Sequence, residues 1–444
     1  MNVQQAVSFL LDKAMKAGAT AAESSGICSR SIAASCRMGK TESLEYAETS
    51  GADLRVFIGK RQAVVSSCVL DEKTLENLAT TAVEMAKATP PDEFCGLADK
   101  ESRATQFPDL DLCDNFEPNA QQLKELALEA EQAALENKKI VNSDGAQADY
   151  AYSDILTRSS TGFSYARKKT NFSLSVCVVA QSENDAKERD YDYTSATHFG
   201  DMTNARTIGK NAAERTVKRL NAKKIPSANL PVILDKRIAR RFFGYFLSAV
   251  NGSAAAKKTT FLAGKMHQSV FHPSVNLIEN PFVKRGLASR PCDAEGLPCI
   301  QRNLIDKGVL TCWLTDLNAA RRLNIPPTGH AVRSFGGMPH AAPSNIFVSG
   351  GDKTPAELIK SIHKGILITD VFGNGVNLVT GDYSQGAFGY LIENGEIATP
   401  VHEITIAGNL TDLFARTVLG NDNTTGFAVN APTVLIENIS VSGK

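Results

Sequence analysis

The second half of the chain is a series of short apolar runs separated by turns, and this pattern restricts the fold more than any other feature. Asp306–Gly308 separates two such runs, and Asn394-Gly395 separates two more. Asn-Gly between apolar runs is a strong signal for a β-hairpin. Many short strands joined by turns are typical of sandwiches and barrels. We therefore expect residues 226–444 to form a mainly β, sandwich- or barrel-like domain whose last strand is Thr433–Val441.

The first half mixes helical and strand-like patterns. Val3–Ala17, Ala120–Glu136 and Thr203–Leu220 carry apolar residues at helical spacing. Ser29–Cys36 and Ala52–Val69 are predicted to be strands, the second of them interrupted by a turn. This half is expected to be a mixed α/β domain, which assigns the whole chain to the α+β class.

Two polar stretches divide the chain into expected segments. Asp92–Pro118 is rich in Asp, Pro and Gly and is expected to be a surface linker, and Asn221–Asn229 is expected to separate the two halves. The predicted division is an N-terminal α/β subdomain over 1–100, a central α/β segment over 101–225 and the β-rich domain over 226–444.

The composition limits the kinds of partner that the protein can bind and indicates its cellular compartment. The 48 basic and 48 acidic residues balance, which argues against direct nucleic-acid binding because phosphate contacts need a basic face. The nine cysteines include no C-x-x-C pair, as expected for reduced thiols in a cytosolic protein. The sequence shows neither a secretory leader nor an apolar run long enough to cross a bilayer. We expect a cytoplasmic protein with no membrane partner.

Motifs for catalysis are weak throughout the sequence. His267 and His272 lie five positions apart, and Pro273 disfavours a helix that would present both to one metal ion. His402-Glu403 continues into a β-branched strand without a second histidine. No complete G-x-S-x-G turn or phosphate-binding loop is present. We therefore predict no catalytic and no metal-ligating residue in this chain, while a hydrolase with an unrecognised Ser or Thr nucleophile remains an open hypothesis.

Several segments resemble one family across nearly the whole chain. The most specific is TGDYSQGAFGYLIENGEIATPVHEITIAGNLTDL, at Thr380–Leu413, and Gly51–Leu97, Thr203–Leu234 and Pro432–Gly443 match as well. These segments resemble the TldD/TldE family, once described as modulators of DNA gyrase, and within it the TldE (PmbA) type of subunit.

The resemblance implies a zinc peptidase assembled from two homologous subunits that acts on small or unfolded peptides. In this family the TldD-type subunit carries H-E-x-x-x-H on a helix, together with a late cysteine ligand. The matching helix here is Asp235–Val250, and the last cysteine is Cys312. That helix holds neither histidine nor glutamate, and it would be a degenerate active-site helix at the following positions: Phe242, Phe243, Gly244, Phe246 and Leu247. Apolar side chains offer no lone pair to zinc.

The resemblance therefore implies a non-catalytic, metal-free subunit that supports assembly and guides substrate. Its expected partners are a zinc-bearing TldD-type subunit and a peptide, and self-association in isolation stays open. Asp382, Tyr383 and Ser384 are candidates for lining a peptide groove, and a purely structural turn is the competing interpretation. The alternative function is an independent homodimeric peptide-binding or scaffold protein without a catalytic partner.

Overall fold

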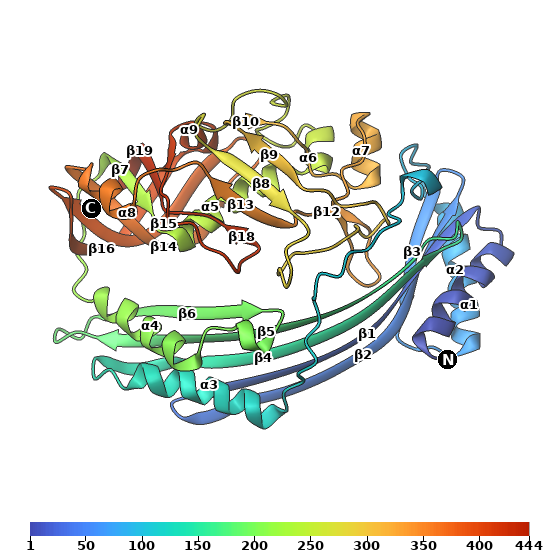
Figure 1. Cartoon of the computed structure of the whole chain (residues 1–444), viewed down its shortest axis with the longest axis horizontal. Coiled ribbons are helices and arrows are strands. Elements are labelled where there is room, and N and C mark those ends of the chain that lie inside the picture. The colour runs from blue at the N-terminus through green and yellow to red at the C-terminus, as the bar shows by residue number, and fades with distance from the viewer. Residues whose placement is uncertain (444) are drawn as a thin grey trace.

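The computed structural model describes residues 1–443 and has the α+β architecture expected from the sequence. Its first half is built on one long, curved antiparallel sheet, and its β-rich second half lies over one face of that sheet (Figure 1). The strand order is β3-β2-β1-β4-β5-β6. In that order the strands span Arg61–Ser67, Lys40–Ile58, Ala21–Arg37, Ile140–Ser159, Ser164–Gln181 and Lys187–Ala196.

The sheet runs across the border expected between residues 100 and 101. β1 pairs with β4 from Glu23 opposite Ser159 to Cys36 opposite Ala146. Residues 1–100 and 101–225 therefore contribute three strands each to a single sheet.

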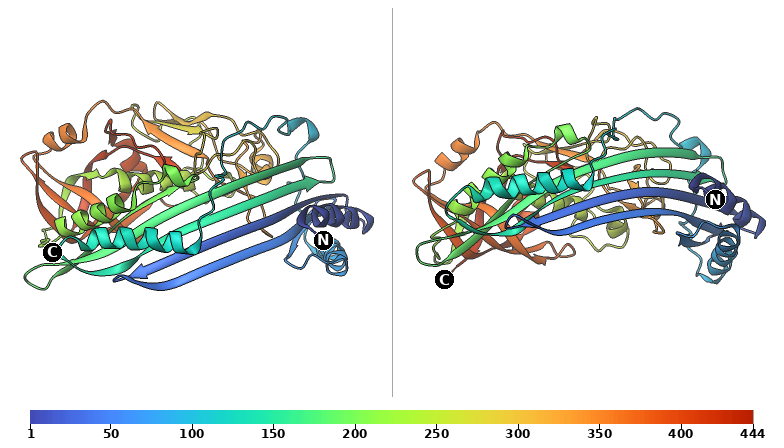
Figure 2. Two further views of the ribbon diagram at one scale, coloured as in Figure 1. Left: turned by 60° about the horizontal axis from the view of Figure 1, so that its bottom comes forward. Right: turned by 90° about the horizontal axis from the view of Figure 1, so that it is seen from below.

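Four helices cover one face of the long sheet (Figure 2). α1 (Val3–Lys16) and α2 (Glu72–Ala88) pack at one end, and α3 (Ala120–Leu135) and α4 (Ala205–Lys218) pack at the other. The helices predicted over Val3–Ala17, Ala120–Glu136 and Thr203–Leu220 are thereby confirmed. Each buries an apolar stripe against the sheet, and this burial is the main source of stability for amphipathic helices of this length.

The alternation of residues along β1 explains why the four helices pack on only one face of the sheet. Ala22 is buried with α1 and α2, whereas Ile32 and Ala34 are buried with α3 and α4. Successive side chains of a strand point to opposite faces. The intervening residues, which include Ser25 and Ser29, therefore face the C-terminal domain, and this face of β1 is mostly small and polar.

The C-terminal domain contains a closed β-barrel, which confirms the prediction of a mainly β, sandwich- or barrel-like domain. Its strands follow the order β16-β15-β14-β7-β19, and β16 also pairs with β19, which closes the ring. Leu234 of β7 pairs with Ile368 of β14 on one side and with Val434 of β19 on the other. The five strands, in chain order from β7 through β14, β15 and β16 to β19, span Ala228–Leu234, Lys364–Val376, Asp382–Glu393, Glu396–Asn409 and Val434–Ser442.

Both hairpins predicted from turn residues are present. Asn394 and Gly395 join β15 to β16 with φ of 52° and 79°. Lys307 and Gly308 join β9 to β10 with φ of 47° and 80°. Positive φ at both central residues defines the turn that Asn-Gly favours in two-residue hairpins.

The remaining elements surround the barrel. A second sheet has the order β10-β9-β8-β13-β18, with strands Val309–Leu310, Arg302–Asp306, Asn276–Asn280, Asn345–Ser349 and Val429–Asn430. The short strands β11, β12 and β17 span Ala331–Val332, His340–Ala341 and Thr417–Leu419. Helices α5 to α9 span Lys236–Ala249, Gly252–Ala256, Leu317–Leu323, Pro355–Lys360 and Leu410–Ala415, and 3-10 turns lie at Lys100–Ser102 and Phe199–Asp201. No helix within residues 1–443 combines the length and apolarity needed to cross a bilayer.

The segment 92–118 is not the surface linker that its composition suggested. Cys95 and Leu110 are only 3% and 5% exposed. The guanidinium of Arg321, in α7, donates to the backbone carbonyls of Phe94, Gly96 and Leu97. The prediction was wrong because a Pro- and Gly-rich segment can also be ordered when side chains of another domain satisfy its backbone groups.

Candidate functional site

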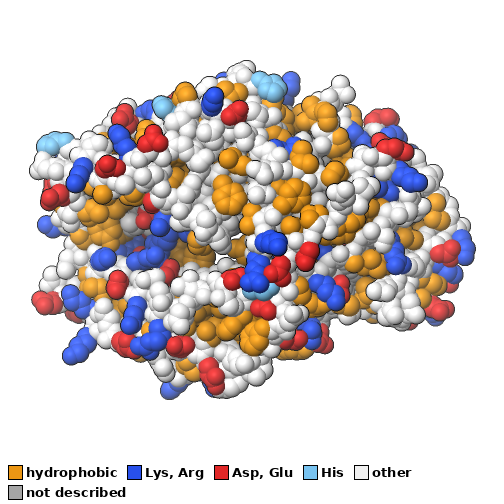
Figure 3. All heavy atoms as spheres, in the orientation of Figure 1, with side chains coloured by type: hydrophobic (Ala, Val, Ile, Leu, Met, Phe, Trp, Pro, Cys, Tyr) orange, Lys and Arg blue, Asp and Glu red, His pale blue; other side chains and the backbone are white. Residues whose placement is uncertain are grey.

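Three depressions lie along the face of the long sheet that turns toward the C-terminal domain. The first, near β3, reaches Cys292–Ala294 and Arg333–Phe335 of the C-terminal domain. The second is lined by residues of β1, β2, β4 and β5 in the middle of the sheet. The third lies between the far end of the sheet and Asp370–Phe372 of β14. We call this row of three depressions the groove, and Figure 3 shows the surface hollowed between the two halves of the molecule.

The floor of the middle depression is formed mostly by small, polar side chains. In its middle, Ser29 of β1 pairs with Thr49 of β2 and with Ser153 of β4, which pairs in turn with Lys169 of β5. Residues that face each other across strands lie side by side on the same face. The floor therefore presents a row of hydroxyl groups that ends at one lysine.

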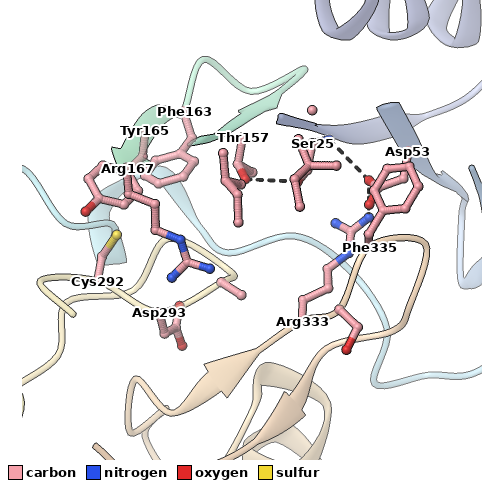
Figure 4. Close-up of a pocket in the computed structure, with 15 residues that line it drawn as sticks. Ser25, Asp53, Thr157, Phe163, Tyr165, Arg167, Cys292, Asp293, Arg333 and Phe335 are labelled. Atoms are coloured by element: carbon pink, nitrogen blue, oxygen red, sulfur yellow. Dashed lines mark hydrogen bonds and ion pairs between the residues drawn. The ribbon is translucent and has the colours of Figure 1, made fainter. Parts of the chain in front are cut away.

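The first depression is a pocket around Arg167, with a cavity volume of about 60 Å³ (Figure 4). Arg167 lies on β5 opposite Ile155, which lies opposite Ile27 of β1. We call this the Arg167 pocket. It is lined by Ser25, Gly26, Ile27, Asp53, Ile155, Thr157, Phe163, Tyr165, Arg167, Cys292, Asp293, Ala294, Arg333, Ser334 and Phe335.

The two carboxylates of the Arg167 pocket are already hydrogen-bonded. Asp53 accepts from the guanidinium of Arg333 and from the backbone N–H groups of Ser25 and Gly336. Asp293 accepts from three backbone N–H groups, those of Glu295, Leu297 and Ala331. Burial raises the pKa of both carboxyl groups, and these hydrogen bonds oppose the rise.

Arg167 has no such partner. Within residues 1–443, its guanidinium makes no hydrogen bond and no ion pair, whereas Arg333 across the pocket is bonded to two carboxylates. Arg167 stays exposed to water from the groove. Desolvation by the surrounding walls lowers the pKa of its guanidinium, which remains charged at neutral pH.

Buried ion pairs between the two halves border both ends of the groove. Beyond the Arg167 pocket, Arg333 bonds Glu23 at 2.7 Å, and Arg55 lies 3.4 Å from Glu295. At the far end, Asp190 lies 3.4 Å from both Arg219 and Arg237, and Arg219 also bonds Asp370 of β14 at 2.8 Å. Such pairs stabilise an arrangement only when each charge keeps its partner, so they define where the two halves meet.

The helix predicted to replace an active-site helix is α5, and its inner face is part of the hydrophobic core. Phe242, Phe243, Phe246 and Leu247 are at most 6% exposed, and Gly244 lies on the outer side. The rings contact two phenylalanines from later in the chain: Phe242 meets Phe414 edge-to-face with centroids 5.0 Å apart, and Phe243 stacks on Phe271 with centroids 5.7 Å apart. Aromatic pairs at these distances add to the stability that burial provides.

Asp382, Tyr383 and Ser384 lie at the start of β15, outside the lining of the groove described above. Tyr383 is 4% exposed, packs in the barrel core and meets Tyr245 at a ring distance of 6.0 Å. Asp382 accepts a hydrogen bond from the hydroxyl of Thr380 at 2.6 Å within the preceding turn. Asp382 and Ser384 are exposed to solvent, whereas Tyr383 is buried in the core of the barrel.

One arrangement that sequence reasoning missed resembles a nucleophile triad. His330 Nδ1 lies 2.8 Å from Thr328 Oγ1, and His330 Nε2 lies 2.6 Å from Glu279 Oε2. Both side chains of the His–Glu pair are 2% exposed. Burial lowers the pKa of His330, and although burial alone would raise the pKa of Glu279, hydrogen bonds from His330 and Ser344 lower it. A neutral imidazole donating to a buried carboxylate, out of reach of substrate, is a structural element of the core.

The closed barrel and the helix-backed sheet belong to a known class of protein, the PmbA/TldD-type metallopeptidases. The family's models match in three parts: domain 1 over residues 29–86, the central domain over 113–220 and the C-terminal domain over 227–443. The chain belongs to the PmbA/TldA metallopeptidase family, which confirms the resemblance seen in the sequence.

Individual relatives cover almost the whole chain. It is 35% identical to metalloprotease PmbA of Escherichia coli over 93% of this chain and 90% of that protein. It is 34% identical to a PmbA homologue of Haemophilus influenzae over 99% and 96%. Among solved structures, a candidate DNA gyrase modulator from Bacteroides thetaiotaomicron superimposes with a TM-score of 0.91 at 28% identity, over 99% of both chains. TldE of Thermococcus kodakarensis shares the fold, with a TM-score of 0.87 at 20% identity over 99% of this chain and 100% of that one.

The family name implies a metal ion, and the residues present do not fit one. Within residues 1–443, no three His, Cys, Asp or Glu side chains come together in a way that could hold a metal. On α5, the buried positions that would face such an ion are phenylalanine and leucine, which cannot coordinate zinc. The described residues therefore supply no site for a metal-dependent catalytic step.

Proposed function

We propose that this chain is the metal-free, non-catalytic member of a TldD/TldE-type peptidase built from two homologous subunits, and that its groove guides an extended peptide toward the partner's zinc. The observation that carries the proposal is α5, where Phe242, Phe243 and Phe246 are buried in an aromatic core at the place where the family's zinc ligands are expected. A side chain cannot both fill the core and reach a solvent-accessible ion.

The groove supports the guiding role. Its middle depression has a floor lined by hydroxyl groups, and the groove lies between two clusters of interdomain ion pairs. Small polar side chains accept many sequences, because they exclude few side chains and exchange hydrogen bonds with a backbone or with water. This chemistry suits unfolded peptides of varied sequence.

The cysteines support a cytoplasmic assembly. All nine are free thiols, and Cys36, Cys292 and Cys299 are buried. Reduced thiols persist in a reducing compartment, so we place the complex in the cytoplasm.

Reconstitution tests the proposal directly. We expect a TldD-type partner with H-E-x-x-x-H to co-purify with this chain. An unstructured fluorogenic peptide should be cleaved only when both subunits are present. Changing the glutamate of the partner's motif to glutamine should abolish this activity. The chain alone should show no peptidase activity. Zinc-independent cleavage by the pure chain would establish a hydrolase instead, and exclusive homodimers in the presence of the partner would favour the scaffold alternative.

A groove-blocking variant tests guidance separately from assembly. Ser153→Trp places a bulky ring on the floor of the groove, whereas Lys168→Trp places the same ring on the opposite face of β5, where Lys168 is 61% exposed. In the complex, Ser153→Trp should lower kcat/KM for peptides while leaving co-purification intact, and Lys168→Trp should leave both unchanged. Equal kcat/KM for the two variants would remove the groove from the proposal.

A further inference from the structure

The unpaired guanidinium of Arg167 is exceptional in this molecule. Of the arginines within residues 1–443, only Arg167 and Arg240 donate no hydrogen bond and form no ion pair, and the Arg240 guanidinium lies 3.7 Å from the centroid of the Phe427 ring. Arg167 has neither kind of partner, yet it stands inside a pocket rather than on an open surface. A fixed cation in a recess that is bonded to no carboxylate is a ready site for an anion.

The pocket selects the kind of anion. A guanidinium presents a planar fork of donors that matches a carboxylate in a bidentate geometry. Asp53 and Asp293 line the same pocket but form no ion pair with Arg167, and their oxygens accept hydrogen bonds from Arg333 and from backbone N–H groups instead. The anion must therefore come with a ligand.

The walls select an apolar group next to that carboxylate. Ile27 and Ile155 lie in the same cross-strand row as Arg167. Phe163, Tyr165 and Phe335 add aromatic surface to the pocket. A carboxylate bonded to Arg167 would thus have its neighbouring side chain against apolar walls, where burial contributes about 25 cal/mol per Å².

The groove also ends at this pocket. One row beyond Ser25 and Asp53, Glu23 pairs with Arg55, and both side chains are covered by the C-terminal domain through Arg333 and Glu295. The side chains of all four residues are at most 5% exposed. A peptide lying in the groove cannot continue past this wall, so the pocket meets an end of the peptide rather than an internal residue.

We infer that the Arg167 pocket binds the free α-carboxylate of a peptide that has an apolar C-terminal residue. This inference rests on the proposed function and deepens it, because it gives the peptide a direction in the groove. A peptide anchored by its C-terminus extends from the Arg167 pocket over the serine row toward the far depression.

Binding to the purified chain tests the anchor. The probes are two hexapeptides of Ser and Ala with a C-terminal leucine and an N-terminal dye, one with a free carboxylate and the other with a C-terminal amide. By fluorescence anisotropy, the acid should bind the wild-type chain at least about 10-fold more tightly than the amide, which corresponds to about 1.4 kcal/mol. Arg167→Gln should remove this preference, and Arg167→Lys should restore part of it.

Lys168→Gln is the matched control, since it removes the same charge one residue further along β5 from the opposite, exposed face. It should keep the full preference for the acid. Arg167 has no bonding partner to lose, so thermal melting of Arg167→Gln should match the wild type and show that the variant is folded.

The outcomes separate the anchor from the groove. If acid and amide bind the wild type equally and Ser153→Trp weakens both, the groove stands and the anchor is wrong. If Arg167→Gln keeps the preference for the acid, the carboxylate binds elsewhere and the inference fails. If neither peptide binds the wild-type chain, both the inference and peptide guidance by this chain alone are overturned.

Discussion

Arg333 Nη1 lies 2.7 Å from Glu23 Oε1, and the two side chains are only 5% and 3% exposed, although the residues are 310 positions apart in the sequence. The same guanidinium bonds Asp53. One arginine of the C-terminal domain thus neutralises two carboxylates of the long sheet. These contacts stabilise the packing of the C-terminal domain on the long sheet at the end of the groove.

Removing Arg333 should destabilise the protein strongly. Arg333→Met leaves Glu23 and Asp53 buried without their cation, and breaking a buried pair in this way costs about 3–5 kcal/mol. Arg206→Met is the control, because its pair with Glu136 is 46% and 51% exposed and such pairs contribute about 0–1 kcal/mol. Guanidinium unfolding of the two variants measures the contrast, and a similar loss in both would refute the role given to Arg333.

Glu295 should make stability depend on pH. Burial raises the pKa of this carboxyl from 4.5 to about 8 in the folded chain, and Arg55 offsets part of the rise. A carboxyl with a raised folded-state pKa binds more protons when folded than when unfolded. Its contribution is therefore favourable at low pH and is lost as the pH rises from about 4.5 to about 8.

The measurement compares unfolding free energies of wild type and Glu295→Gln at about pH 5 and about pH 8. The wild type should lose more stability over this interval than the variant, whose amide does not titrate. Parallel pH profiles would show that Glu295 has an ordinary pKa in the folded state.

Two helical glycines should respond in opposite ways to alanine. A Cβ at Gly209 of α4 would lie 2.1 Å from the carbonyl oxygen of Ala130 in α3, while a Cβ at Gly244 of α5 would have nothing within 4 Å. Gly209→Ala should lose about 1–3 kcal/mol through overpacking, and Gly244→Ala should gain about 0.5–1 kcal/mol through helix propensity. Thermal melts of the two variants decide this, and a gain at Gly209 would mean that α3 and α4 are not in close contact.

Metal removal should leave the isolated chain unchanged. A resident structural zinc ion contributes on the order of 10 kcal/mol of folding free energy, and no cluster within residues 1–443 could hold one. Dialysis against a chelator should therefore leave Tm where it was. A fall in Tm that zinc reverses would reveal a site formed by this chain, and would contradict the metal-free assignment.

Local patterns in the sequence predicted much of the fold. Helices α3 and α5 have apolar stripes at helical spacing, and the Asn394-Gly395 turn determines its own hairpin. These features depend on neighbouring residues alone. By contrast, β1 begins at Ala21, well before the predicted Ser29, because pairing with β2 and β4 stabilises a Ser- and Gly-containing stretch of low intrinsic strand preference.

The candidate site could not be predicted from the sequence, because it also depends on how distant strands pair. Ile27, Ile155 and Arg167 share one row only because β1, β4 and β5 pair in a particular register. A shift of one residue would send Arg167 to the helix-covered face. The alternation of Ser25, Ser29, Ser31 and Ser35 was the available signal for a polar face, but it could not show what lies opposite.

The order of strands in the barrel has a consequence for how the chain matures. β7 is the first strand of the C-terminal domain, but it pairs with β19, the last strand. β19 also pairs with β16. During synthesis, the edges of β7 and β16 that pair with β19 therefore stay unpaired until β19 emerges from the ribosome. Ribosome-bound intermediates that lack β19 should be the form of this protein most in need of a chaperone.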